Sequence, residues 1–165
     1  MTARPVYPKG RKSAKKTAYF HALGIVVEWK SRTINDNFGV HTDMEIIEIK
    51  ENKKQFLPLL LLADEQESMI DRYIDRGMMY VLVDNGVKCE CVVTDEGKGI
   101  LEIKNIATAP EYQGKGYGKA LIDFVAAKYK GKYSILQVGT GDSPLTVPFY
   151  EKSGFVRSHS IKNFF

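Results

Sequence analysis

The residues best suited to chemistry lie in a glycine-rich run, Gln113-Gly114-Lys115-Gly116-Tyr117-Gly118. A β-rich segment from Ile100 to Thr108 precedes it, and an amphipathic segment from Lys119 to Tyr129 follows it. A strand, a glycine loop and a helix in this order place unpaired backbone N–H groups and the positive end of a helix dipole in one spot. Glycine permits positive φ and has no Cβ to block a phosphate. The run therefore predicts a pyrophosphate site, and the alternative is an ordinary glycine turn before a helix.

The spacing of the glycines excludes two common nucleotide motifs. A Rossmann fingerprint needs a glycine three residues after Gly116, where Lys119 stands. A P-loop needs Gly-Lys followed by Ser or Thr, and Ala120 follows Gly118-Lys119. The spacing that fits is Gln/Arg-x-x-Gly-x-Gly/Ala. In this respect the chain resembles the GNAT family of N-acetyltransferases, whose coenzyme A loop has that pattern.

A second segment carries the same resemblance. The run from Phe149 to Phe155, Phe-Tyr-Glu-Lys-Ser-Gly-Phe, is similar to the family's Leu-Tyr-Glu-Lys-x-Gly-Phe, and a strand-like run from Tyr133 to Val138 lies between the two motifs. The resemblance covers residues 44–165. It implies an α/β (α+β) fold, with a mixed central sheet whose antiparallel N-terminal strands splay at the coenzyme site, and with flanking helices.

The resemblance also implies a reaction and its binding residues. Acetyl-CoA would be the co-substrate, with no metal, and its acetyl group would pass to a primary amine by direct attack in a ternary complex. The pantetheine arm would pair with the backbone of Ile106, Ala107 and Thr108, and the Ile106 N–H would polarise the thioester carbonyl. The pyrophosphate would bind Gln113, Gly114, Lys115, Gly116, Tyr117 and Gly118. Charge would be added by Lys115 or Lys119, and the alternative for either is a solvated lysine at the helix start. Family members commonly have Asn where Ser143 stands, so one coenzyme contact departs from the pattern.

Two residues are candidates for moving protons. An amine with a pKa near 10.4 is only about one part in a thousand neutral at pH 7, so a group must take its proton. Glu102 stands where the histone-acetyltransferase branch of the family carries its general base, although a strand carboxylate can simply face solvent. Tyr150 aligns with the tyrosine that protonates the leaving thiolate; its alternative role is packing between helix and sheet.

Basic residues concentrate before Met44. Residues 1–43 contain eight Lys/Arg and three Asp/Glu, a net charge of +5, and the chain total of +4 leaves −1 for the rest. We expect residues 1–43 to be a basic, partly flexible leader and residues 44–165 to be the acetyltransferase domain, with its final strand absent. The favoured interpretation makes the leader dispensable. The competing one lets residues 23–30 fill the vacant strand position, from the same chain or from the partner in a homodimer.

The composition limits the class of protein. A chain of 165 residues with 44% hydrophobic and 27% charged residues is typical of one soluble domain. We expect a cytoplasmic protein, because no apolar run reaches 18 residues and no signal peptide is recognisable. Cys89 and Cys91 are expected to be small core or half-buried residues in a reducing compartment, and the three histidines share no metal-ligand spacing.

Two helices and a hairpin turn are expected before the glycine loop. The helices are expected at residues 55–62 and 65–76, with Asp64 capping the second, and Asn85-Gly86 predicts the hairpin turn.

The acceptor is expected to be a small-molecule or peptide amine, with no membrane partner and no role for nucleic acid. The alternative is a non-catalytic acyl-CoA sensor or interaction module, whose basic arm binds nucleic acid or a partner.

Overall fold

A computed structural model describes residues 24–29, 44–141 and 146–161 of the chain. Within these residues, seven strands form one mixed sheet in the order β2-β3-β4-β5-β6-β1-β7. β5 and β6 are parallel, and the other neighbouring strands are antiparallel. The strands are β1 (Gly24–Trp29), β2 (Glu45–Ile49), β3 (Met78–Val83), β4 (Val87–Gly97), β5 (Ile100–Thr108), β6 (Ile135–Gly141) and β7 (Phe155–Ile161).

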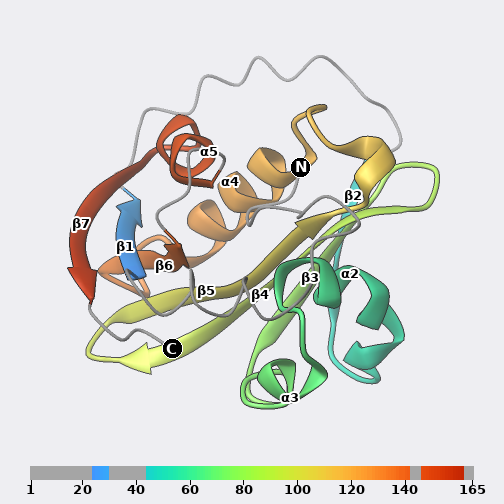
Figure 1. Ribbon diagram of the computed structural model, residues 1–165, viewed down its shortest axis with the longest axis horizontal. Coiled ribbons are helices and arrows are strands. Elements are labelled where there is room, and N and C mark those ends of the chain that lie inside the picture. The colour runs from blue at the N-terminus through green and yellow to red at the C-terminus, as the bar shows by residue number, and fades with distance from the viewer. Residues whose placement is uncertain (1–23, 30–43, 142–145, 162–165) are drawn as a thin grey trace.

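Helices cover both faces of this sheet (Figure 1). α4 and α5 lie on one face, and α2 and α3 lie on the other, where α2 packs on β4 and β5. Proline in the first turn of α2 fits that position, because its fixed φ suits a helix start and no N–H is needed there. The helices are η1 (Lys53–Phe56), α2 (Leu57–Ala63), α3 (Glu67–Ile70), η2 (Pro110–Tyr112), α4 (Tyr117–Tyr129) and α5 (Thr146–Lys152). The expected mixed α/β fold is therefore confirmed.

The position of β1 shows which segment fills the strand position that the sequence left vacant. Its residues belong to the segment before Met44, and they pair antiparallel with β6 on one side and with β7 on the other. Figure 1 shows this blue strand between the two. The strand position that we expected to be vacant is thus filled from the same chain. The described sheet thus includes residues 24–29, upstream of the expected domain start at Met44, in the position that the competing interpretation gave them.

Two apolar clusters lie on the two faces of the sheet. The larger joins β3 to β6 with α4 and α5, and the smaller joins β3 and β4 with α2 and with Tyr73 and Ile74 beyond α3. Cys89 and Cys91 are fully buried in the larger cluster, as free thiols. Burial raises the pKa of Cys89 to about 12 and raises that of Cys91 well above its usual value. Both are therefore inert core residues, as the sequence predicted.

A buried polar network ties α2 to the sheet. The Tyr73 hydroxyl donates to Asp64 Oδ2 at 2.6 Å, and Asn105 Nδ2 donates to Tyr73 Oη at 2.8 Å and to the Leu60 carbonyl at 3.0 Å. All three polar side chains are at least nine-tenths buried. The prediction that Asp64 caps the following helix is wrong, because α3 begins after Gln66 and has no side-chain cap. That helix is also shorter than expected, since turns replace it after Ile70.

We expect Tyr73→Phe to lower the free energy of unfolding by about 1–3 kcal/mol, because it leaves a buried carboxylate oxygen without this donor. Tyr133→Phe is the matched control, since the Tyr133 hydroxyl donates to Asp95 at 3.0 Å on the surface. Its loss should cost less than about 0.5 kcal/mol. Urea denaturation of the two variants measures the difference, and equal values would show that the buried network contributes no more than a surface hydrogen bond.

Candidate active site

The parallel strands β5 and β6 stay together for only part of their length. Their pairing runs from Ile100 opposite Ile135 to Ile103 opposite Val138. Beyond that point β6 continues beside β1, and β5 continues beside β4. Residues 104–108 of β5 therefore have a strand neighbour on one side only within the described chain. This is the stretch that the sequence assigned to the pantetheine arm, through Ile106, Ala107 and Thr108.

A β-bulge marks the point where the two strands separate. On β5, Ile103 pairs with Val93 and Asn105 pairs with Val92, so Lys104 is an extra residue in the ladder. A bulge bends its strand and increases the local twist. Asn105, the next residue, belongs to the buried network with Asp64 and Tyr73. The network thus fixes β5 just before Ile106.

The glycine loop follows β5 and the short helix η2 and leads into α4. Gly114 and Gly116 have φ values of 80° and 88°, and a Cβ built on either meets no atom within 4 Å. Both positions therefore need glycine for their backbone conformation, while the space beside them stays open. Gly116 is the N-cap residue of the 13-residue helix α4. Open space and first-turn N–H groups at a helix N-terminus fit a pyrophosphate.

The loop is fastened to the strand end and to the β3–β4 hairpin. Gln113 Nε2 donates to the Thr108 carbonyl at 3.3 Å, which closes the loop onto β5. The Tyr117 hydroxyl donates to Asp84 Oδ2 at 2.6 Å, next to the hairpin turn. The sequence predicted the Asn85-Gly86 turn, which the structure confirms, but it gave no sign that this turn packs against the loop.

A further residue at the hairpin, Lys88, supports the segment before the loop and was missed from the sequence. The Lys88 ammonium lies 3.7 Å from the centre of the Tyr112 ring, and the Ala109 N–H donates to the Lys88 carbonyl at 2.9 Å. Lys88 is buried, so its aliphatic stem and its charge both contact protein. A lysine between two hydrophobic strand residues carries no sequence signal for this role.

The two lysines expected to add positive charge to the loop differ in their contacts. Lys119 Nζ pairs with Asp123 Oδ2 at 2.6 Å, one helical turn further along α4. Lys115 Nζ lies 5.3 Å from the centre of the Tyr112 ring, within the loop itself. Lys115 is therefore the better placed of the two to attract phosphate.

Glu102 lies on β5 beside β6 and is held by two partners. Lys104 Nζ lies 2.8 Å from Glu102 Oε1, and Gln137 Nε2 donates to Oε2 at 2.8 Å. Its side chain is 13% exposed. Lys104 also pairs with Glu96 at 3.3 Å, and Glu96 pairs with Arg76 at 2.9 Å. Glu102 is thus the innermost carboxylate of a chain of alternating charges.

Tyr150 lies on α5 and is fully buried. Its ring makes edge-to-face contacts with Phe149 and Phe155, with centroid distances of 5.2 and 5.5 Å. These contacts fix the ring between α5 and the start of β7. Ser143, the remaining expected coenzyme contact, lies outside the described residues.

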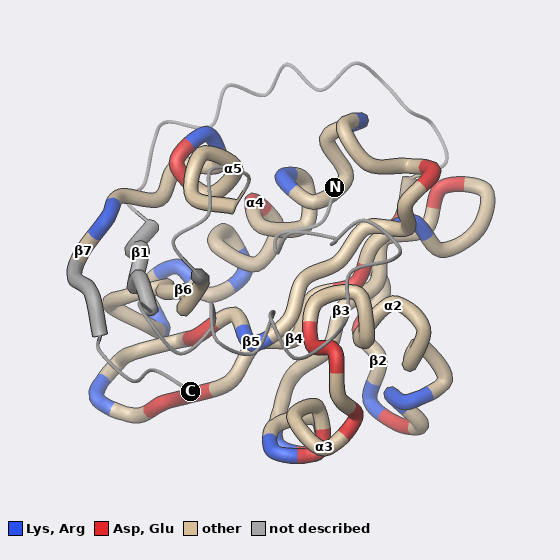
Figure 2. Tube along the Cα trace, viewed as in Figure 1, with Lys and Arg blue, Asp and Glu red and all other residues tan. Residues whose placement is uncertain are grey.

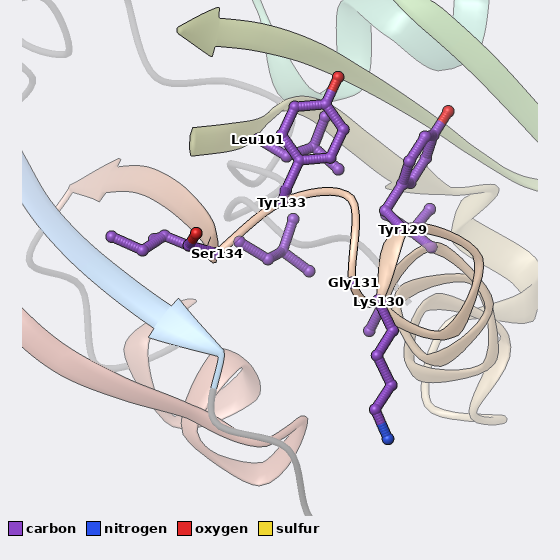
Figure 3. A pocket seen from close by; sticks show the side chains of 10 residues that line it. Leu101, Tyr129, Lys130, Gly131, Tyr133 and Ser134 are labelled. Atoms are coloured by element: carbon purple, nitrogen blue, oxygen red, sulfur yellow. The ribbon is translucent and has the colours of Figure 1, made fainter. Parts of the chain in front are cut away.

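A cavity of about 210 Å³ lies at the far end of β5 from the glycine loop. Its wall combines the last turn of α4 with the starts of β5 and β6, and Figure 3 shows Leu101, Tyr129 and Tyr133 around it. The cavity therefore lies at the opposite end of α4 from the loop that we expect to bind the coenzyme.

The described surface carries both signs of charge. Basic and acidic residues are interspersed along the described trace, including the helices that flank the sheet (Figure 2). In the part of the chain that the structure describes, no group of three or more His, Cys, Asp and Glu side chains could hold a metal ion. Nor does any helix there have the length and apolar character needed to cross a membrane.

A strand that leaves its parallel neighbour beside a glycine loop and a helix N-terminus is the arrangement that the resemblance to the GNAT family implies for an acetyl-CoA site. Comparison with known proteins gives the same family. Residues 75–157 match the family model described as "Acetyltransferase (GNAT) domain". The chain therefore belongs to the GNAT acetyltransferase family, and acetyl-CoA is its co-substrate.

Relatives of this family come from several bacteria. An uncharacterized N-acetyltransferase of Bacillus subtilis, YvbK, is 31% identical over 109 residues, which cover 64% of this chain and 70% of the relative. A solved GNAT acetyltransferase of Elizabethkingia anophelis with acetyl-CoA bound is 34% identical (TM-score 0.69; 75% and 83% covered). The structure titled "IAA acetyltransferase" from Bacillus cereus is 38% identical (TM-score 0.61; 67% and 75% covered).

We expect Gly116→Val to abolish most of the affinity for acetyl-CoA, because a branched side chain would occupy the space beside the loop and strain its positive φ. Gly131→Val is the matched control. Gly131 has a similar φ of 82° and open space, but it lies at the other end of α4. Calorimetry should show acetyl-CoA binding to Gly131→Val as to the wild type. Equal affinities in all three folded proteins would exclude the loop as the coenzyme site.

Proposed function

We propose that the protein transfers the acetyl group of acetyl-CoA to a primary amine of a small molecule or peptide, by direct attack in a ternary complex. The observation that carries this proposal is the end of β5–β6 pairing at Ile103 and Val138, on the strand that leads to the glycine loop. Bacterial relatives and two buried free thiols support a bacterial, cytoplasmic enzyme. In the reaction, a C–N bond forms to the acyl carbon and the C–S bond of the thioester breaks.

The backbone beyond the bulge would bind the pantetheine arm. Ile106, Ala107 and Thr108 lie where β5 has lost β6, so an extended ligand can pair there as a strand would. The Ile106 N–H would stabilise negative charge on the thioester oxygen. Residues 113–118 would hold the pyrophosphate, with Lys115 adding charge. Acetyl-CoA supplies the activated acyl group, and every other step depends on side chains of this chain.

Glu102 would take the proton of the attacking amine. Its two oxygens each accept from one described partner, and a carboxylate has about four acceptor positions, so it can also accept from an amine or a water. Lys104 and Gln137 hold it in one orientation. The same contacts would fit a residue that only organises the sheet, which is why its pH dependence matters.

Tyr150 would give its proton to the sulfur that leaves. A phenol with a pKa near 10 is suited to protonating a thiolate. The ring is held on two sides by phenylalanines, so its hydroxyl is kept in one position without solvent around it.

The complete burial of Tyr150 equally suits packing, which favours one other candidate function: an acyl-CoA sensor that binds without turnover. An amine panel with acetyl-CoA distinguishes the two. The enzyme should release thiol in step with acetylated product detected by mass. Binding of acetyl-CoA with no amine-dependent thiol release across the panel would establish the sensor instead.

We expect Tyr150→Phe to reduce turnover about 10²-fold or more while acetyl-CoA affinity stays within about twofold, because the substitution keeps the ring contacts and removes only the proton. Phe149→Leu is a control for changed packing around the same ring. Steady-state kinetics with calorimetry measures both. Wild-type turnover in Tyr150→Phe would leave Tyr150 a packing role and water as the proton donor.

We expect Glu102→Gln to reduce turnover by about tenfold or more near pH 7 and to approach the wild type at high pH, where the amine is already neutral. Glu96→Gln is the matched control, since Glu96 shares Lys104 but lies further from β6. Its effect should be small and independent of pH. A pH–rate profile for each variant decides, and a uniform loss in Glu102→Gln would indicate binding rather than proton transfer.

A further inference from the structure

We propose that β1 positions Tyr150 for the reaction, so that the catalytic unit includes residues 24–29 of the leader. This inference rests on the proposed role of Tyr150 as the acid. It concerns the strand that connects α5 and β7 to the rest of the sheet.

The connection of β7 to the sheet runs through β1. β7 pairs with β1 from Gly24 opposite Ile161 to Trp29 opposite Phe155. β6 pairs with the other edge of β1, so β1 separates β6 from β7 in the described sheet. Without β1, β7 would have no hydrogen-bonded neighbour among the described strands. Figure 1 shows β7 at the outer edge of this arrangement.

Tyr150 is coupled directly to the start of β7. Its ring contacts the ring of Phe155, the first residue of β7, and the backbone of Phe155 is opposite Trp29 of β1. The turn between α5 and β7 is tightly bonded, since Ser153 Oγ donates to the Phe149 carbonyl at 2.9 Å. A displacement of β7 would therefore be transmitted to Tyr150 through one short, rigid turn.

β1 also supports β6, the strand on the other side of the opening from β5. It pairs with β6 from Gln137 to Gly141, and most of that length lies beyond the point where β6 leaves β5. The glycine loop, by contrast, is built on β5, α4 and the β3–β4 hairpin, none of which touches β1 in the sheet. Loss of β1 should consequently impair turnover more than it impairs binding of the coenzyme pyrophosphate.

The experiment weakens β1 in the full-length chain with Val26→Pro. Proline removes a backbone N–H from a strand that has a neighbour on both sides, and proline is disfavoured in such strands. Val26→Ile, which keeps the backbone N–H and a β-branched apolar side chain, is the matched control. We expect Val26→Pro to lower kcat about tenfold or more, with acetyl-CoA affinity falling by a smaller factor. Val26→Ile should leave both close to the wild type.

A double variant tests whether β1 acts through Tyr150. If it does, Val26→Pro combined with Tyr150→Phe should be no slower than Tyr150→Phe alone, because coupled residues are not additive. If Val26→Pro fails to fold, Val26→Gly replaces it, since glycine weakens the strand and keeps its hydrogen bonds. The same comparison with Tyr150→Phe then applies.

The outcomes separate this inference from the proposed function. Wild-type kcat in Val26→Pro, or multiplicative losses in the double variant, would overturn the role of β1 while leaving Tyr150 as the acid. Unchanged turnover in Tyr150→Phe would overturn the acid role and with it the coupling to β1. A loss in each single variant with no further loss in the double supports the inference.

Discussion

The structure depends on an interruption of backbone hydrogen bonding between two parallel strands. β5 and β6 pair up to Ile103 and Val138 and then separate. Backbone groups inside a protein need partners, so strands part only where something else can supply them. A ligand arm that binds as an extended strand meets that requirement and is oriented by it. The glycine loop lies directly after the interruption, where an arm bound along β5 would lead to its phosphates.

Separate contacts hold the two strands apart. On the β5 side, the bulge at Lys104 is followed by Asn105, which is fixed to α2 by hydrogen bonds to Leu60 and Tyr73. On the β6 side, β1 pairs with the opposite edge of β6 from Gln137 to Gly141, so β6 keeps a strand neighbour past the point where β5 leaves it. Each strand is thus supported on its far side by another strand, β4 for β5 and β1 for β6, while the edges that face the opening have no strand neighbour among the described residues.

Features that depend on residues close together in the sequence were predictable, and features that depend on distant residues were not. The strand, glycine loop and helix at 100–129 and the Asn85-Gly86 hairpin are set by residues close in sequence, through turn chemistry and periodicity, and the structure confirms them. The place of β1 depends on pairing between residues 24–29 and residues more than 100 positions away, so local patterns offered it only as the competing interpretation for residues 23–30. Asp64 looked like a helix cap because aspartate commonly caps helices, yet its partner Tyr73 decided its role. The contacts of Lys88 with Tyr112 and Ala109 were not predicted either, because these residues are also distant from it in the sequence.

The groups expected to bind the coenzyme and those expected to move protons differ in the same way, in how far apart their supporting residues lie in the sequence. The groups that would bind coenzyme phosphates come from one contiguous segment, residues 113–118, closed by a hydrogen bond from Gln113 to Thr108. The two proton-transfer candidates depend on distant pairing: Glu102 is oriented by Gln137 across β5 and β6, and Tyr150 rests on Phe155, whose strand is held by β1. We therefore expect coenzyme binding to depend mainly on local structure and turnover to depend on the sheet as far as β7. On the role proposed for β1, a segment that looks like a basic leader in the sequence would help to align the reacting groups.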